Sequence, residues 1–96
     1  MDVSTLRLRA LEGTPLEDER VRAMVLATAR AIAERSGVTL RRLEATPDRV
    51  TLTVELDRLG ALGLVTELRN VTNAWYEGKF HAGPLWVTHD EEERWD

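Results

Sequence analysis

The sequence contains no cysteine, so neither a disulfide framework nor a thiolate metal site is available to this chain. Aromatic residues make up only 5% of the 96 residues. Long apolar runs are also missing: residues 1–10 alternate polar and apolar types, which is not the pattern of a signal peptide or a membrane anchor. From these absences we expect a cytoplasmic protein with no membrane partner.

Basic residues are not in excess in this sequence. Thirteen Lys and Arg against seventeen Asp and Glu give a net charge of −4, whereas proteins dedicated to duplex DNA are usually basic. The acids gather at residues 17–19 and 90–93, so a local basic face remains possible. The length and the 43% hydrophobic fraction suit one ordinary globular unit. We predict a single domain over residues 1–89, followed by an acidic, frayed tail over residues 90–96.

Local patterns in the first half predict a strand followed by a helix. Residues 3–10 end in strict polar/apolar alternation, which is typical of a half-buried strand. Thr14, Pro15 and Glu17 then form a helix start with a cap, a first-turn proline and a capping acid. Apolar residues at helical spacing continue to Ile32, and Ser36-Gly37 ends the helix.

The middle of the chain predicts two strands joined by a turn. The apolar residues from Val38 to Ala45 change phase by one residue at Arg41-Arg42, which indicates a β-bulge. Residues 46–48 make the turn. Val50–Leu56 then alternates apolar with polar residues throughout, so we expect this strand to be central with one face buried.

A second helix and a final strand complete the prediction. Asp57 can cap a helix that runs to about Tyr76, with Glu77-Gly78 ending it. Residues 85–88 predict a short last strand. The order strand, helix, strand, strand, helix, strand predicts an α+β, ferredoxin-like fold, in which a four-stranded antiparallel sheet carries two helices on one face.

Several motifs in order resemble one family. Residues 45–54, Ala-Thr-Pro-Asp-Arg-Val-Thr-Leu-Thr-Val, are similar to the Met-Pro-Asp-His-x-His strand of REP-associated single-tyrosine transposases. The helix segment at residues 64–69 with Asn73, the Gly-Pro-Leu-Trp run at residues 83–86 and the acidic residues 90–93 also match that family in order. The resemblance spans about residues 5–93 and implies the ferredoxin-like fold and a nucleic-acid partner.

The sequence departs from this family at the residues that carry its chemistry. The two metal-binding histidines of the family fall at Arg49 and Thr51, and neither an arginine nor a lone threonine replaces imidazole as a ligand. The family's nucleophilic tyrosine lies on a later helix than Tyr76. Metal-assisted attack on a phosphodiester needs both parts. The resemblance therefore implies a truncated, catalytically inactive relative, with no catalytic residue, metal or cofactor.

Basic residues around the central hairpin are the candidate nucleic-acid contacts. Arg41, Arg42 and Arg49 flank the hairpin, which faces nucleic acid in the family that the chain resembles. Further candidates for phosphate contacts are Arg58, Arg69 and Lys79. The alternative interpretation is that the hairpin arginines are solvated charges on a bulged edge strand, where charge discourages aggregation.

Three other features carry weaker functional hypotheses. Residues 60–63, Gly-Ala-Leu-Gly, are similar to a phosphate-clamping GxxG loop, but close packing of helix on sheet explains them better. His81 and His89 are eight residues apart across a Gly-Pro loop and are interpreted as surface residues. Trp95 lies among acids and is either frayed or an anchor for a partner protein. No cofactor fingerprint is present.

Two functional hypotheses follow. In the first, the chain is a non-catalytic, transposase-like domain that binds structured or single-stranded DNA or RNA as an accessory factor. In the second, it is a protein–protein adaptor or a homodimerisation module without nucleic-acid binding. The position of the arginines in space distinguishes them, because one coherent basic face favours the first and dispersed arginines favour the second.

Overall fold

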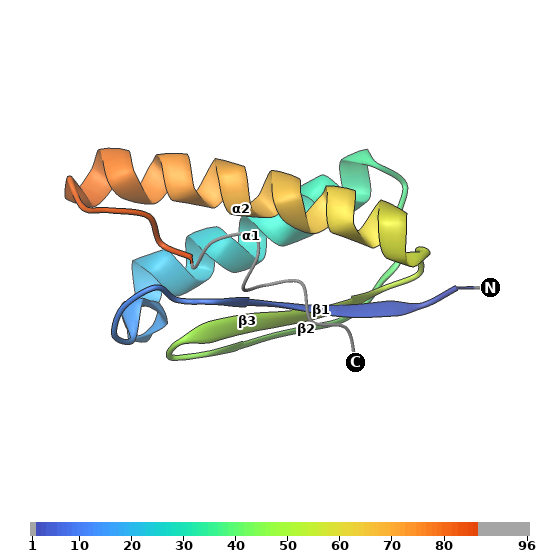
Figure 1. Cartoon of the computed structure of the whole chain (residues 1–96), viewed down its shortest axis with the longest axis horizontal. Helices are drawn as coiled ribbons and strands as arrows, with labels where there is room; N and C mark the ends of the chain where they lie inside the picture. The colour runs from blue at the N-terminus through green and yellow to red at the C-terminus, as the bar shows by residue number, and fades with distance from the viewer. Residues whose placement is uncertain (1, 87–96) are drawn as a thin grey trace.

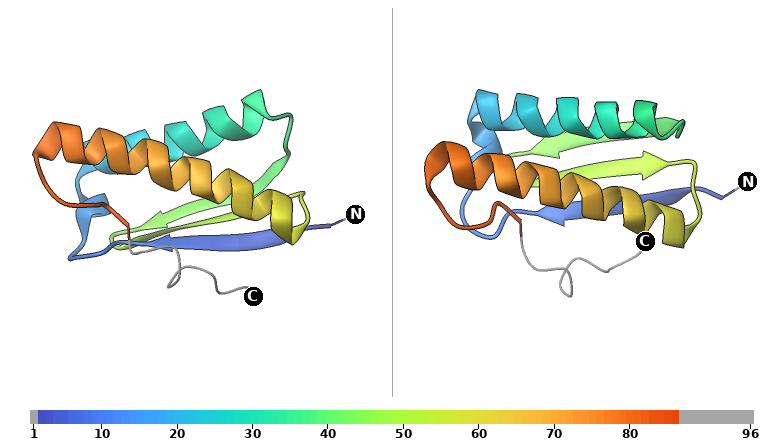
Figure 2. Two further views of the ribbon diagram at one scale, coloured as in Figure 1. Left: turned by 45° about the horizontal axis from the view of Figure 1, so that its top comes forward. Right: turned by 90° about the horizontal axis from the view of Figure 1, so that it is seen from above.

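Two helices lie side by side across one face of a three-stranded antiparallel sheet (Figure 1). The computed structural model describes residues 2–86. In chain order, its elements are β1 (Ser4–Arg9), the short 3-10 helix η1 (Pro15–Glu17), α1 (Glu19–Arg35), β2 (Leu40–Thr46), β3 (Arg49–Val54) and α2 (Arg58–Phe80). Both helices cover the same side of the sheet, as the view from above shows (Figure 2). The α+β class is thus as predicted.

Strand β3 is the centre of the sheet, in the order β1-β3-β2. Val50, Leu52 and Val54 alternate along it and are fully buried under the helices. Leu6 and Leu8 of β1 stand opposite Leu52 and Val50 and complete the same apolar surface. The prediction of a central, half-buried strand is confirmed, because period-two alternation places every apolar residue of β3 on one side. The strand ends at Val54, two residues before the predicted end at Leu56.

The predicted β-bulge is present in β2. Leu40 is the partner of Val54, and Arg42 is the partner of Thr53, so Arg41 is the extra residue. Beyond the bulge, Leu43 and Ala45 face Leu52 and Val50 in regular register. The inserted residue returns the apolar side chains of β2 to the helix side of the sheet after the change of phase in the sequence.

The prediction of a four-stranded sheet is wrong for the part of the chain that the structure describes. Where the fourth strand was expected, Trp86 makes an isolated bridge with Ala10, and residues 87 and 88 lie outside the described range. The reason is that the backbone N–H groups of this segment are bonded to a side chain. The Asn73 side-chain oxygen accepts hydrogen bonds from the N–H groups of Leu85 (2.9 Å) and Trp86 (3.2 Å). Donors bound to a side chain cannot form a strand ladder.

The start of α1 differs from the prediction. Thr14 precedes η1, and Asp18 caps α1, where its carboxylate accepts a hydrogen bond from the N–H of Arg20 at 2.8 Å. The helix ends as predicted at Ser36 and Gly37, the latter with φ of +69°, a conformation that glycine adopts without strain.

Asp57 caps α2 as predicted, with its carboxylate 2.7 Å from the N–H of Gly60. The helix does not end at Glu77-Gly78 but continues to Phe80, and His81 closes it in the left-handed conformation with φ of +53°. Gly78 is exposed, and a single glycine costs a helix only about 1 kcal/mol. The interpretation of residues 60–63 as a packing contact is also wrong at Gly63, where an added Cβ would meet no atom within 4 Å.

The core fills the space between the helices and the sheet. Val25, Ala29 and Ile32 of α1 and Val65 and Leu68 of α2 pack against the apolar side of the strands.

No helix within residues 2–86 is both long and apolar enough to cross a membrane.

Candidate nucleic-acid interface

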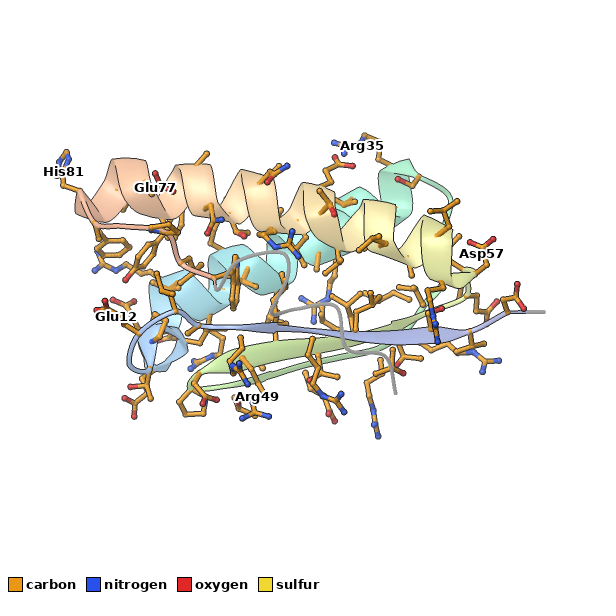
Figure 3. The ribbon with its side chains drawn as sticks, viewed as in Figure 1. Glu12, Arg35, Arg49, Asp57, Glu77 and His81 are labelled. Carbon is orange, nitrogen blue, oxygen red and sulfur yellow. The ribbon has the colours of Figure 1, made fainter. Side chains whose placement is uncertain are left out.

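The side of the sheet that faces away from the helices is polar along all three strands. The strand register arranges it as three rows, each with one residue from β1, β3 and β2 in that order. We call this surface the outer sheet face; its rows are Thr5, Thr53 and Arg42, then Arg7, Thr51 and Glu44, then Arg9, Arg49 and Thr46. Arg49, on the central strand, is seen on the side opposite the helices (Figure 3).

Positive charge gathers on this face although the chain as a whole is acidic. The face carries four arginines, and the bulged Arg41 lies at its edge. Three carboxylates, those of Glu44, Asp48 and Glu55, form ion pairs with these arginines. Among residues 2–86, the five cations and the three carboxylates paired with them sum to +2, whereas the whole chain carries −4. The remainder of the molecule therefore carries −6, and the outer sheet face is its basic region.

The arginines that form ion pairs on this face are exposed. Arg41 lies 2.8 Å from Glu55, Arg49 lies 3.3 Å from Asp48, and Arg42 lies 3.7 Å from Glu44. The three arginine side chains remain between 45% and 63% exposed. Exposed pairs of this kind typically contribute about 0–1 kcal/mol, so an incoming phosphate can displace the carboxylates at little cost.

Asp48 holds the turn between β2 and β3. Its carboxylate accepts hydrogen bonds from the guanidinium of Arg49 and from the hydroxyl of Thr46 at 3.1 Å. The bond from Arg49, followed by the one from Thr46, lowers the pKa of Asp48 below its ordinary value. The backbone oxygen of Asp48 also accepts from the N–H of Ala10 at 2.8 Å, which fixes the hairpin turn against the end of β1.

Two arginines of the outer sheet face, Arg7 and Arg9, were not among the predicted contacts. The signal for them is present in the sequence, because they alternate with the buried Leu6 and Leu8. Local sequence patterns do not indicate that β1 lies next to β3, because that pairing joins distant segments of the chain. That pairing places Arg9 directly opposite Arg49.

The structure brings together three of the six predicted basic contacts. Arg41, Arg42 and Arg49 share the outer sheet face or its bulged edge. Arg58 and Lys79 are exposed at opposite ends of α2, about 32 Å apart at the α-helical rise of 1.5 Å per residue. Arg69 is 7% exposed, on the buried side of the same helix. These three residues lie in the helical layer and are not part of the outer sheet face.

The remaining candidates do not assemble into a site within residues 2–86. Tyr76 packs on Phe80 with ring centroids 4.9 Å apart, and His81 ends α2. His89 and Trp95 lie outside the described residues. In the described part of the chain, no three His, Asp or Glu side chains lie close enough together to hold a metal ion.

A hollow of about 110 Å³ lies between the loop after β1 and the end of α2. Leu11, Glu12, Tyr76 and Pro84 are among the residues that line it. Pockets for small-molecule ligands usually measure about 300–1,000 Å³, so this hollow does not suit a nucleotide.

Comparison with known proteins finds similarity in structure but not in sequence families. No protein-family model matches the chain, and no curated protein matches it. Among solved structures, a similar one is described as a "putative transposase" from Deinococcus radiodurans R1, with a TM-score of 0.70 and 19% identity. The match covers 94% of this chain and 82% of that one. The chain therefore has a transposase-like fold.

Proposed function

We propose that this chain is a non-catalytic relative of the REP-associated single-tyrosine transposases that binds structured or single-stranded nucleic acid as an accessory factor. The observation that carries the proposal is the gathering of Arg7, Arg9, Arg41, Arg42 and Arg49 on and beside the outer sheet face. One coherent basic face favours the nucleic-acid hypothesis, whereas dispersed arginines would favour the adaptor hypothesis. The transposase-like fold supports the same choice.

The absence of catalysis is part of the proposal and depends on residue types. The resemblance assigns metal ligands to positions 49 and 51, which here are an arginine and a threonine. Arg49 stands beside Arg9, and two neighbouring cations produce a positive potential that repels a divalent ion. Incubation with hairpin and single-stranded DNA plus magnesium or manganese should give no cleavage and no covalent adduct. A repurified protein that still cleaves DNA would contradict this part of the proposal.

Binding is tested by removing cations from the outer sheet face. Replacing Arg7, Arg42 and Arg49 with glutamine removes three charges, and we expect affinity for nucleic acid at low salt to fall by tenfold or more. The matched control replaces Arg20, Arg30 and Arg35 of α1, which are exposed and lie in the helical layer. Both variants have a net charge of −7, so a difference between them reports position and not overall charge.

The salt dependence provides a second measurement. Each phosphate contact on a single strand contributes about −0.7 to the slope of log affinity against log salt. Three contacts therefore predict a slope near −2, and the sheet-face variant should lose most of it. If fluorescence anisotropy detects no binding to hairpin, duplex or single-stranded DNA or RNA at low salt, the nucleic-acid hypothesis is wrong and the adaptor hypothesis replaces it.

A further inference from the structure

The outer sheet face has cations but no aromatic side chain on which bases can stack. Its nine residues are arginines, threonines and one glutamate, and strands β1, β2 and β3 contain no aromatic residue. Proteins that hold single strands without sequence preference usually combine a basic groove with aromatic side chains, and each stacked base contributes about 1–3 kcal/mol. This face therefore lacks one of the two interactions that such binding uses.

The cations of this face are held at fixed separations. Arg49 and Thr53 are four residues apart on β3, so the row that contains Arg42 lies about 13 Å from the row that contains Arg9 and Arg49. The outer strands, β1 and β2, are about 10 Å apart across the sheet. Arg42, Arg9 and Arg49 thus occupy the ends of an area of about 10 by 13 Å, and Arg7 lies at its middle row.

A fixed array of cations favours a fixed array of phosphates. In a double helix, base pairing already holds the phosphates of both strands in place, and their charge density is one per 1.7 Å of axis. A single strand must lose conformational freedom to align its phosphates with these arginines, and no stacking on an aromatic side chain of this face offsets that loss. The threonines between the arginines are small, so a backbone can approach the sheet closely. The hydroxyls of Thr5 and Thr53 bond one another at 2.9 Å and that of Thr46 donates to Asp48, so the arginines are the main donors of this face.

We infer that the outer sheet face binds the sugar–phosphate backbone of double-stranded DNA, without base specificity, in preference to a flexible single strand. This inference rests on the proposed function and narrows its ligand class. Glu44 stands in the middle row, between the two rows that hold most of the arginines. Its carboxylate repels the backbone, so it limits affinity and its neutralisation should strengthen binding.

The test compares a short DNA duplex with its two component strands, each labelled and titrated with the full chain in fluorescence anisotropy. We expect the duplex to bind at least tenfold more tightly than either strand, with little change when its sequence is shuffled. Four contacts predict a salt slope near −3.6 on the duplex, at about −0.9 per contact. Glu44→Gln should tighten duplex binding by about twofold or more.

A gain-of-function variant gives an independent readout. Thr51→Phe places one aromatic ring in the centre of the face, at a half-exposed strand position where such residues are favoured. We expect its affinity for single strands to rise at least about fivefold, which corresponds to the lower limit of stacking on one base. Duplex affinity should not rise.

The outcomes separate this inference from the proposed function. Binding to single strands that equals or exceeds binding to the duplex overturns the inference and leaves the proposed function intact. A Thr51→Phe variant with unchanged single-strand affinity also overturns it, because stacking would then not be the missing interaction. Absence of binding to every DNA form overturns both.

Discussion

Arg9 and Arg49 stand directly opposite one another across strands β1 and β3, with both side chains exposed on the outer sheet face. Directly paired side chains in an antiparallel sheet lie about 5 Å apart at Cβ, and like charges at that separation destabilise the pair. Asp48 lies beside Arg49 and offsets part of its charge. Under the proposed function, a phosphate bound between the two arginines would reduce their mutual repulsion.

The repulsion can be measured with a double-mutant cycle. Arg9→Gln, Arg49→Gln and the double variant isolate the interaction of the two side chains from their other contacts. We expect an unfavourable coupling of about 0.2–1 kcal/mol in urea unfolding at low salt, and a smaller value at high salt because the charges are exposed. A favourable coupling, or one that salt does not change, would contradict the prediction.

Stability should depend on the inner side of β3 and not on its outer side. Leu52 is fully buried between the sheet and the helices, so Leu52→Ala should lower the free energy of unfolding by about 2–4 kcal/mol. Thr51, its neighbour on the outer sheet face, is the control, and Thr51→Ala should cost less than about 1 kcal/mol. Similar losses at the two positions in urea titrations would mean that β3 is not buried on one side only.

A buried hydrogen bond joins α2 to the segment after it. The indole N–H of Trp86 donates to the hydroxyl of Thr72 at 2.8 Å, and both side chains are buried. Thr72→Val keeps the volume but leaves the indole N–H without this acceptor, at a cost of about 1–3 kcal/mol. Adding Trp86→Phe removes the donor as well, so the double variant should be more stable than the sum of the single effects predicts. Strict additivity in thermal unfolding would argue against the bond.

Acid should weaken the turn between β2 and β3 through Asp48. Its pKa is lowered in the folded protein, chiefly by the hydrogen bond from Arg49. A group with a depressed folded-state pKa contributes stability above its unfolded pKa of about 3.9, and this contribution is lost as the pH falls from there through the folded value. Melting temperatures measured from pH 7 to pH 3 should therefore fall less steeply below pH 4 for Asp48→Asn than for the wild type. Parallel curves would contradict this role.

Local patterns were sufficient to predict those parts of the fold that local physics determines. The alternation in β3, the change of phase that marks the bulge at Arg41 and the cap at Asp57 each depend on neighbouring residues, and each is confirmed. The errors arose where a distant group decides. The donors of Leu85 and Trp86 bind the side chain of Asn73, an interaction across twelve and thirteen residues that no local pattern announces.

The candidate site was predicted in part for the same reason. Arg41, Arg42 and Arg49 belong to one hairpin, so adjacency in sequence was enough to group them. Arg7 and Arg9 join them through the pairing of β1 with β3, whose partner residues are forty or more positions away in the sequence. The prediction that Arg69 contacts phosphate was made from its charge alone. Arg69 comes directly after the buried Leu68, and the structure places both residues on the buried side of α2.

The bulge in β2 has a consequence for which genetic changes the protein tolerates. Leu40 and Leu43 are three residues apart, yet the extra residue Arg41 lets both lie on the side of the sheet that packs against the core. Replacing Arg41 with another polar residue keeps the three-residue spacing of Leu40 and Leu43. Because the Arg41 side chain is exposed, its replacement should cost little stability. Deleting it would leave Leu40 and Leu43 two residues apart, a spacing that strict alternation also places on one side of the sheet, so both could remain inside without a bulge. The loss of this one codon would therefore preserve which side chains of β2 face the core, and the strand would lose only its bulge.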